Sequence, residues 1–386
     1  MDKSFLSRLT FWKSVAIILI TLGLYSVFIR FTGGLGAATN LSDEFPWGLW
    51  LGFNILCGVG LSAGGFTLCG IVYIFNLKDF KPLVRPAILT AFLGYLLVIT
   101  ALMIELGRPD KIWHTLIMWN PRSVMFEVAW CVMLYTTVLA LEFSPIVLER
   151  LGWKTPLKII KSITIPLVIA GVLLSTLHQS SLGSLYLIVP NKLYGLWYSE
   201  LLPVFFFISA LTVGCGMVII ESYLSSRTFK RELEFPLLLR LGQVMVILIM
   251  VNVVVKFIDL MDRNSFDLLF LNRTETYLYW LEVFLGLIVP FIMMNFKKIR
   301  FNRAGLFYSA LFVILGFILN RMNVSVTGME SGSGASYLPS WMEVFITMAI
   351  VSLGFVAFTL IGKYFPVFSE VHTPPNKNSQ ISKYIV

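Results

Sequence analysis

Long apolar runs, separated by short polar stretches, recur along this chain from residue 12 to residue 362. Each run holds roughly 20 mostly apolar residues, the length at which an α-helix crosses the hydrocarbon core of a bilayer. The short alternating segments typical of a membrane β-barrel do not occur in the pattern. We therefore expect an all-α polytopic membrane protein of about ten transmembrane helices. The expected spans are 12–30, 47–75, 83–106, 123–143, 158–178, 197–224, 237–260, 276–296, 303–320 and 340–362.

Composition and charge placement agree with this pattern. The chain is 57% hydrophobic and only 13% charged, which excludes a soluble globular domain. Most of its 30 Lys and Arg residues fall in loops on the side that holds the N-terminus, for example Lys78, Arg150 and Lys297. Because cytoplasmic loops are enriched in basic residues, both termini are expected in the cytoplasm. The net charge of +9 follows from this rule and does not indicate nucleic-acid binding.

Residues able to hold a redox metal are scarce. The four cysteines are expected inside spans as packing residues, since their spacing fits neither an iron–sulfur cluster nor a zinc site. Of the three histidines, His114 is placed in an outer loop, His178 at the end of the fifth span and His372 in the polar tail. A haem with two intramembrane histidine ligands cannot be built from this set, and no methionine is singled out as an alternative ligand.

The chain also contains a weak internal repeat. Gly48-Leu49-Trp50 opens the second expected span and Gly195-Leu196-Trp197 opens the sixth. Ionisable residues then follow at intervals that agree to within one residue: Arg85, Glu105 and Glu127 in the first half, and Arg240, Asp259 and Glu282 in the second. Spans two to five and six to nine are therefore predicted to form two four-helix bundles of the same orientation. The expected divisions are 1–46, 47–196, 197–338 and 339–386, with the first and last helices flanking the bundles.

Ionisable residues inside membrane helices are costly to bury, so they are candidates for function. Glu105, Glu127 and His178 are expected near the outer ends of the third, fourth and fifth spans, where they could share one pocket of the first bundle. Tyr95, deeper in the third span, could relay a proton. Simple packing explains a buried tyrosine equally well, and Glu127 or His178 could instead be hydrogen-bonded structural groups.

The second bundle allows a different interpretation. Lys256 and Asp259 lie three residues apart and can pair on one helical face, which favours a structural, charge-balanced cluster at the outer end. The other members are Glu282, Arg321 and Glu343. Glu221 is expected near the cytoplasmic end of the sixth span with no basic neighbour one turn away. It is either an inner proton entry or a residue that reaches cytoplasmic water.

Several segments resemble the polysulphide reductase/NrfD family of quinone-reactive membrane subunits, and within it the HybB-type subunit of periplasm-facing [NiFe] hydrogenases. The matching segments cover nearly the whole chain up to Pro366. They are Phe45-Pro46-Trp47-Gly48, Val84-Arg85-Pro86-Ala87, Glu105-Leu106-Gly107-Arg108-Pro109, Phe126-Glu127, Leu141-Glu142-Phe143, Glu149-Arg150-Leu151-Gly152-Trp153, His178-Gln179-Ser180-Ser181, Gly183-Ser184 and Tyr337-Leu338-Pro339-Ser340-Trp341. The family often has aspartate at the position of Glu105, so the charge is kept on a longer side chain.

The resemblance implies a subunit of the bacterial inner membrane that contains no haem or iron–sulfur cluster and binds a quinone, expected to be menaquinone, near the outer face. It implies electrons from a periplasmic ferredoxin-like iron–sulfur subunit and, for this subfamily, the small and large subunits of a [NiFe] hydrogenase. The quinone-contacting residues expected on this basis are Glu105, Arg108, His178, Gln179 and Ser180. Those expected to transfer protons are Tyr95, Glu105, Glu127, His178 and Glu221.

Other functions remain open at this point. The same quinone role could serve a polysulphide, nitrite or other NrfD-type complex. A secondary transporter also contains repeats and intramembrane charges, although its charges usually lie at broken helices near the midplane. A purely structural anchor for an outer catalytic subunit is a third possibility. The sequence does not specify the quinone, the direction of electron flow, the catalytic partner, the oligomeric state of the complex or proton pumping.

Overall fold

The computed structural model describes residues 10–368, and this part of the chain is built of helices without β-strands. Predictions for Lys3, Arg8, Lys377, Lys383 and His372 lie outside the described residues. Ten helices in the described part are long and apolar enough to cross a membrane, which confirms the expected helical membrane fold. The spans are built from α2 (Phe11–Gly33), η1 (Trp50–Cys57), α4 (Gly58–Leu61), α5 (Gly64–Cys69), η2 (Gly70–Ile74), α6 (Lys81–Glu105), α8 (Val124–Leu151), α10 (Thr164–Ser184), α11 (Leu202–Thr228), α12 (Phe235–Asp262), α13 (Thr274–Val283), η7 (Phe284–Ile288), α14 (Val289–Asn295), α16 (Arg303–Met322), η8 (Asn323–Thr327), α17 (Gly328–Ser333) and α18 (Trp341–Tyr364).

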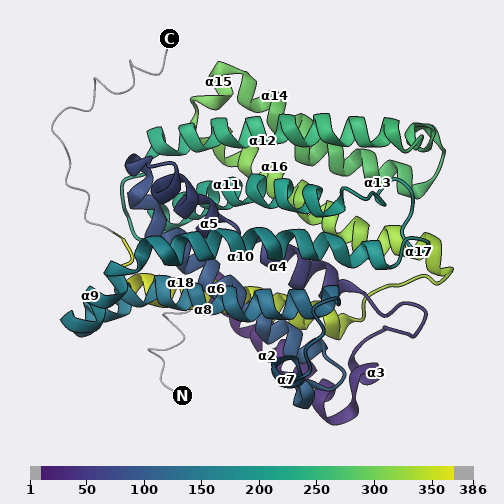
Figure 1. Ribbon diagram of the computed structural model, residues 1–386, viewed down its shortest axis with the longest axis horizontal. Helices are drawn as coiled ribbons and strands as arrows, with labels where there is room; N and C mark the ends of the chain where they lie inside the picture. Colours follow the sequence, from purple (N-terminus) through teal and green to yellow (C-terminus); the bar gives the residue numbers. More distant parts are fainter. Residues whose placement is uncertain (1–9, 369–386) are drawn as a thin grey trace.

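Short elements connect these spans at both ends of the bundle. They are α3 (Leu35–Ala38), η3 (Lys78–Phe80), η4 (Pro109–Lys111), α7 (His114–Ile117), α9 (Lys154–Ser162), η5 (Leu185–Ile188), η6 (Phe266–Phe270) and α15 (Lys297–Arg300). In Figure 1 the spans run across the page, with α9 at the left and α17 at the right. Helix α8 begins near Glu127 and ends near Arg150, so we name the two ends of the bundle the Glu127 end and the Arg150 end.

The fifth span differs most from its expected position. It covers Thr164–Ile188, whereas 158–178 was expected, and α8 continues to Leu151. Gly152 ends α8 in the left-handed conformation (φ 71°) that glycine adopts at little cost. The separate helix α9 then carries Lys154, Lys158 and Lys161 at helical spacing along one face, which suits a membrane surface better than its interior. His178 consequently lies inside the fifth span and not at its end.

The spans pack as two groups joined along α10 and α11. Helices α5, α6, α8 and α10 pack on one another, as do α11, α12, α14 and α16. Helix α2 packs along α18, and α18 in turn packs on α6. The internal repeat and the domain divisions stay predictions from the sequence.

Several spans contain π-helical segments, which widen a helix and often occur at functional sites. One of them, η7, begins two residues beyond Glu282 in the eighth span. Gly286 in η7 meets Gly316 of α16 so closely that neither position has room for a side chain. Because the two backbones touch there, Glu282 of α13 and Asn320 of α16 come within hydrogen-bonding distance (2.9 Å).

Candidate functional site

A buried tyrosine–histidine pair lies inside the first group of helices. The Tyr95 hydroxyl of α6 lies 2.8 Å from Nδ1 of His178 in α10, and both side chains are buried. The ring of Tyr135, from α8, packs edge-on against Tyr95 with 4.7 Å between ring centroids. Nε2 of His178 has no hydrogen-bond partner among the described residues. One ring nitrogen is therefore fixed by Tyr95, while the other remains able to bond a ligand.

The next turn of α10 carries a second polar pair. Ser181 lies three residues beyond His178 on the same face of the helix, and its hydroxyl donates to Oε1 of Glu127 at 2.6 Å. Two of the sequence-predicted residues, Tyr95 and His178, are thus in direct contact. Glu127 reaches the same face of α10 through Ser181, one turn closer to the Glu127 end.

Gln179 and Ser180 lie on the same turn of α10 but have other surroundings. The side-chain amide of Gln179 donates to the Val59 carbonyl at 3.2 Å and thereby ties α10 to α4. Ser180 accepts a bond from Ser184 through its backbone carbonyl, and its hydroxyl forms no hydrogen bond among the described residues. The structure therefore places Gln179 in a helix–helix contact and does not join either residue to the Tyr95–His178 pair.

Glu105 ends α6, and no hydrogen bond joins it to the Tyr95–His178 pair in the described chain. Its neighbours by electrostatic interaction are Glu343 and Tyr186, on α18 and η5. One of its carboxylate oxygens is buried without a hydrogen-bond partner in the described chain. Arg30 closes the end of α6 by donating to the carbonyls of Ile104 and Leu106, at 2.9 and 2.7 Å. Glu105 is thus close to a second acid, Glu343, at the start of α18.

Arg108 is not part of this arrangement. It lies in the exposed loop after α6 and pairs with Asp110 at 3.1 Å. The hydrogen bond from Arg108 lowers the pKa of Asp110, as expected for a carboxylate beside a guanidinium. The structure leaves Arg108 at the surface of the Glu127 end.

Glu343 has a structural role that its sequence position only partly revealed. It completes a capping box with Ser340 at the start of α18 and accepts a 2.5 Å hydrogen bond from Tyr337. It also accepts from the backbone nitrogen of Asn40, which fixes the loop after α3 to α18. Burial, reinforced by the bond to Glu343, raises the pKa of Tyr337, so this phenol stays a donor.

Glu221 lies at the opposite, Arg150 end, on α11. It is only 8% exposed, and its Oε1 has no hydrogen-bond partner among residues 10–368. Arg231, in the loop after α11, interacts electrostatically with both Glu221 and Glu234. Burial raises the pKa of Glu234. The sequence shows no basic residue one turn from Glu221. Arg231 could not be predicted as its neighbour, because the loop after α11 folds back toward Glu221.

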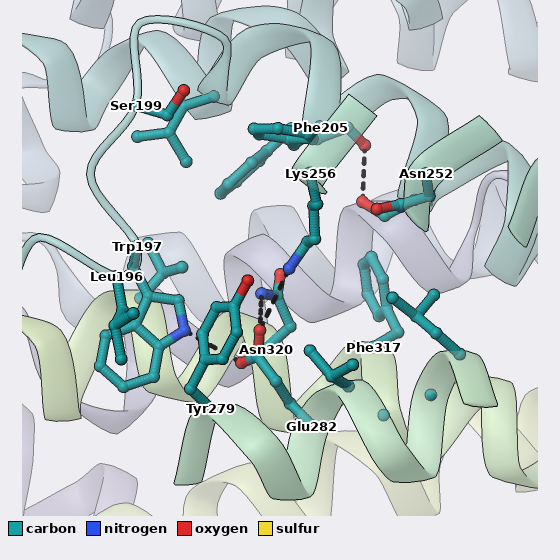
Figure 2. Close-up of a pocket in the computed structure, with 18 of the residues that line it drawn as sticks. Leu196, Trp197, Ser199, Phe205, Asn252, Lys256, Tyr279, Glu282, Phe317 and Asn320 are labelled. Atoms are coloured by element: carbon teal, nitrogen blue, oxygen red, sulfur yellow. Dashed lines mark hydrogen bonds and ion pairs between the residues drawn. The ribbon is translucent and has the colours of Figure 1, made fainter. Parts of the chain in front are cut away.

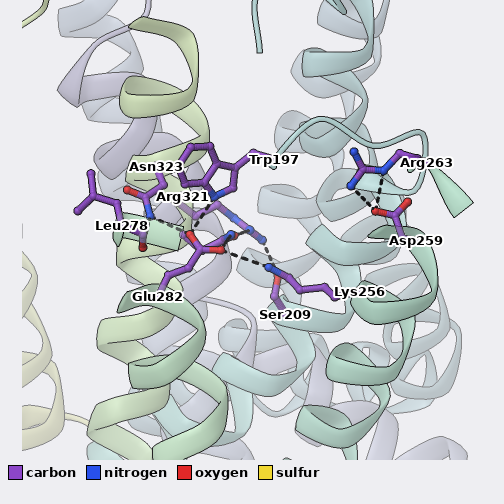
Figure 3. A network of polar contacts seen from close by, with 10 residues as sticks. Trp197, Ser209, Lys256, Asp259, Arg263, Leu278, Glu282, Arg321 and Asn323 are labelled. Atoms are coloured by element: carbon purple, nitrogen blue, oxygen red, sulfur yellow. Dashed lines mark hydrogen bonds and ion pairs between the residues drawn. The ribbon is translucent and has the colours of Figure 1, made fainter. Parts of the chain in front are cut away.

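A buried carboxylate organises the second group of helices. Glu282 accepts hydrogen bonds from Lys256 (3.2 Å), Trp197 (3.1 Å), Asn320 (2.9 Å) and Asn323 (2.8 Å), as Figure 3 shows in part. Four donors, one of them charged, satisfy the oxygens of a carboxyl group that is almost fully buried.

The expected pairing of Lys256 with Asp259 is wrong. Lys256 bonds Glu282 of α13, while Asp259 pairs with Arg263 one turn further along α12 at 2.7 Å. Asp259 also accepts a 2.5 Å bond from Ser199. The charge-balanced character expected for this cluster is present in the structure, with different partners.

Arg321 is buried beside this network. Its guanidinium lies over the ring of Phe206 at 3.6 Å and that of Phe317 at 4.4 Å. It donates to Ser209 and Asn320, both at 2.7 Å. Aromatic faces and neutral oxygens hold this cation between α11 and α16. No carboxylate among the described residues contacts it.

A cavity lies next to the network, between α11, α12, α13 with η7, and α16 (Figure 2). It encloses about 790 Å³ of space, its open mouth included. Sequence reasoning placed the ligand site in the first bundle and missed this cavity. A signal was present, since Asn252, Lys256, Asp259 and Arg263 of α12 are spaced by four, three and four residues and all line it.

Comparisons with known proteins place the chain among membrane subunits of redox enzymes. The family model described as "Polysulphide reductase, NrfD" matches residues 37–330. A protein of Nitratidesulfovibrio vulgaris is 37% identical over 92% of this chain and 93% of its own length. The "Probable Ni/Fe-hydrogenase 2 b-type cytochrome subunit" of Escherichia coli is 33% identical over 95% of this chain and 94% of its own. The "Menaquinone reductase, integral membrane subunit" of N. vulgaris is 28% identical over 96% and 94%.

Proposed function

The chain belongs to the polysulphide reductase NrfD family, and from that premise we propose that it is the quinone-reactive membrane subunit of a respiratory oxidoreductase complex. The observation that carries the proposal is the buried His178, with Nδ1 held by Tyr95 and Nε2 free. A quinone head group offers carbonyl oxygens that accept one hydrogen bond from such a nitrogen. The name of the N. vulgaris menaquinone reductase subunit makes menaquinone the first candidate for this quinone.

The chemistry of the pair suits quinone reduction, in which one quinone takes up two electrons and two protons to give the quinol. When Nδ1 accepts the Tyr95 hydroxyl proton as a hydrogen bond, the ring proton resides on Nε2. Nε2 then donates to a carbonyl oxygen and passes its proton to that oxygen as electrons arrive. Tyr95 and the Ser181–Glu127 pair on the next turn supply replacement protons.

In this proposal the electrons come from a partner subunit, and side chains within residues 10–368 supply the protons. We place the Glu127 end at the outer membrane face, with both termini in the cytoplasm, following the distribution of basic loops. A ferredoxin-like iron–sulfur subunit docked at that end delivers the electrons. The likeness to the E. coli hydrogenase subunit favours a [NiFe] hydrogenase as their source.

The name of that E. coli relative refers to a b-type cytochrome, so the fit of a haem to this chain was tested. His178 is the one histidine in the described membrane spans, and its Nδ1 is committed to Tyr95. Two axial histidines on facing helices are therefore not available within residues 10–368. The residues do not fit a bis-histidine haem, and the proposed function uses none.

Replacing Tyr95 with Phe tests the relay. Without the hydroxyl, Nδ1 of His178 loses its buried partner and the preferred tautomer is no longer fixed. We expect the rate of quinone reduction by the purified complex to fall about tenfold to a hundredfold, within the range of general acid–base effects, with KM changed far less than kcat. Tyr308→Phe, at an exposed tyrosine of α16, is the matched control. An unchanged kcat in Tyr95→Phe would contradict the relay.

Proton translocation is part of the proposal, with Glu221 as the cytoplasmic end of the route. Its support is a buried carboxylate with an unpartnered oxygen at the Arg150 end. In reconstituted vesicles, Glu221→Gln is expected to lower the number of protons moved per electron while quinone reduction continues. Glu232→Gln, in the loop beyond α11, serves as the control. An unchanged proton-to-electron ratio in Glu221→Gln removes Glu221 from the route.

A further inference from the structure

Neither Tyr95 nor His178 lines the cavity of the second helix group. Its apolar walls include the rings of Phe205 and Phe317, and the ring of Tyr279 lies at its edge (Figure 2). Helix α12 packs closely on α11 but makes few close contacts with α13. The mouth of the cavity is thus expected between α12 and α13, where the exposed side chains Phe257 and Phe284 face lipid.

Three polar groups in the cavity have unused hydrogen-bonding capacity. Asn252 is 4% exposed, and its Oδ1 has no partner in the described chain. The Tyr279 hydroxyl points into the cavity and forms no hydrogen bond to a described residue (Figure 2). Lys256 donates to Glu282 and retains two further N–H donors. Leaving a buried amide without a hydrogen-bond partner costs on the order of 1–3 kcal/mol. We therefore expect a bound ligand to supply the hydrogen bond during function.

The charges around the cavity determine what kind of partner fits. Lys256 is paired with Glu282, and Arg263 with Asp259, so the charges that line the cavity are balanced. Arg321, behind Phe206 and Asn320, does not belong to the lining. A free cation would be repelled by Lys256 or Arg263, and a free anion by Glu282 or Asp259, because each ion pair presents both signs of charge. An uncharged ligand with carbonyl oxygens accepts from Lys256, Tyr279 and the side-chain N–H of Asn252 without that cost, and a ligand hydroxyl donates to Oδ1 of Asn252.

We propose that this cavity binds an uncharged planar ring with carbonyl or hydroxyl oxygens, a second quinone drawn from the membrane. The aromatic walls match the ring, the three unused polar groups match its oxygens, and a mouth between α12 and α13 would leave a path for an isoprenoid tail. The π-helical η7 widens the eighth span beside the cavity, since Gly286 and Leu287 line it. The proposal is independent of the site at His178, although it invokes the same substrate class.

The test is the number of quinones bound by the complete complex in lipid nanodiscs. The complex is equilibrated with menaquinone-4, separated from free quinone by gel filtration, extracted and quantified by absorbance. The wild-type protein is expected to retain about two equivalents per chain. Asn252→Leu and, separately, Tyr279→Phe are expected to retain about one, and Asn295→Leu, at an exposed asparagine of α14, about two.

His178→Ala separates this proposal from the proposed function. Combined with Asn252→Leu it is expected to leave no bound quinone, while alone it leaves the one in the cavity. The cavity proposal is overturned if Tyr279→Phe and Asn252→Leu both retain two equivalents of bound quinone. It is also overturned if the wild-type protein binds one equivalent of quinone and only His178→Ala removes it. If Asn252→Leu fails to assemble, Tyr279→Phe, which keeps the ring, decides alone. Two equivalents retained by His178→Ala would count against the site at His178 and leave the cavity proposal standing.

Discussion

Replacement of His178 by Ala is expected to lower quinone reduction by the assembled complex about a hundredfold or more, the scale at which general acid catalysts contribute. The change removes the nitrogen that faces the quinone and also leaves the Tyr95 hydroxyl without its acceptor. Electron entry from the external donor does not use either group. Reduction of a water-soluble dye by the partner subunits should therefore continue at the wild-type rate.

The measurement compares quinone reduction with dye reduction in the same preparation. His114→Ala is the matched control, because His114 lies in the short helix α7 outside the spans. A loss of quinone reduction alone supports a quinone site at His178. Equal rates in His178→Ala and the wild-type protein, with assembly intact, would instead favour a purely structural anchor.

Replacement of Glu282 by Gln is expected to be among the most destabilising single changes in the second helix group. The carboxylate accepts from Lys256, Trp197, Asn320 and Asn323. A glutamine amide offers one acceptor oxygen in place of two. Its NH₂ group also points N–H donors at the donors that bonded the carboxylate. Removing one partner of a buried ion pair typically costs about 3–5 kcal/mol, chiefly because the other charge is left buried and unpaired.

Thermal unfolding in detergent, followed by the loss of monodisperse protein, measures this effect. Glu200→Gln, at an exposed loop position, should leave the midpoint unchanged. Replacing both partners, Lys256→Met with Glu282→Met, should recover only the part of the stability that is lost through the unpaired charge. Trp197, Asn320 and Asn323 still lose their acceptor in this variant. A midpoint for Glu282→Gln equal to that of the wild-type protein would show that the network does not stabilise the fold.

The helices themselves could be predicted from the sequence because the length of each apolar run alone decides whether it spans a bilayer. The fifth span was misplaced because residues 158–163 are apolar enough to extend the run in a hydropathy reading. Only the spacing of the α9 lysines, together with the break at Ile163, shows that this segment is separate. The same shift moved His178 from the end of a helix to its interior.

Side-chain partners were harder to predict, because they depend on how each helix is rotated about its axis. Helices that are apolar on all sides carry little periodic signal to fix that rotation. The contact between Tyr95 and His178 joins residues 83 positions apart, so sequence could name both residues without pairing them. Lys256 of α12 likewise bonds Glu282 on another helix. Glu282 also bonds Asn320, because Gly286 and Gly316 bring the eighth span and α16 together.

The most direct test is a cryo-electron microscopy structure of the complex with a short-chain quinone analogue bound. A quinone site at His178 predicts ring density with an oxygen about 3 Å from Nε2 of His178, a normal hydrogen-bond distance. Density in the second-bundle cavity as well would agree with the further inference. The account would be contradicted if density for the analogue lay only at that cavity or at the loops, and if protein enclosed Nε2 of His178 so that no ligand could reach it.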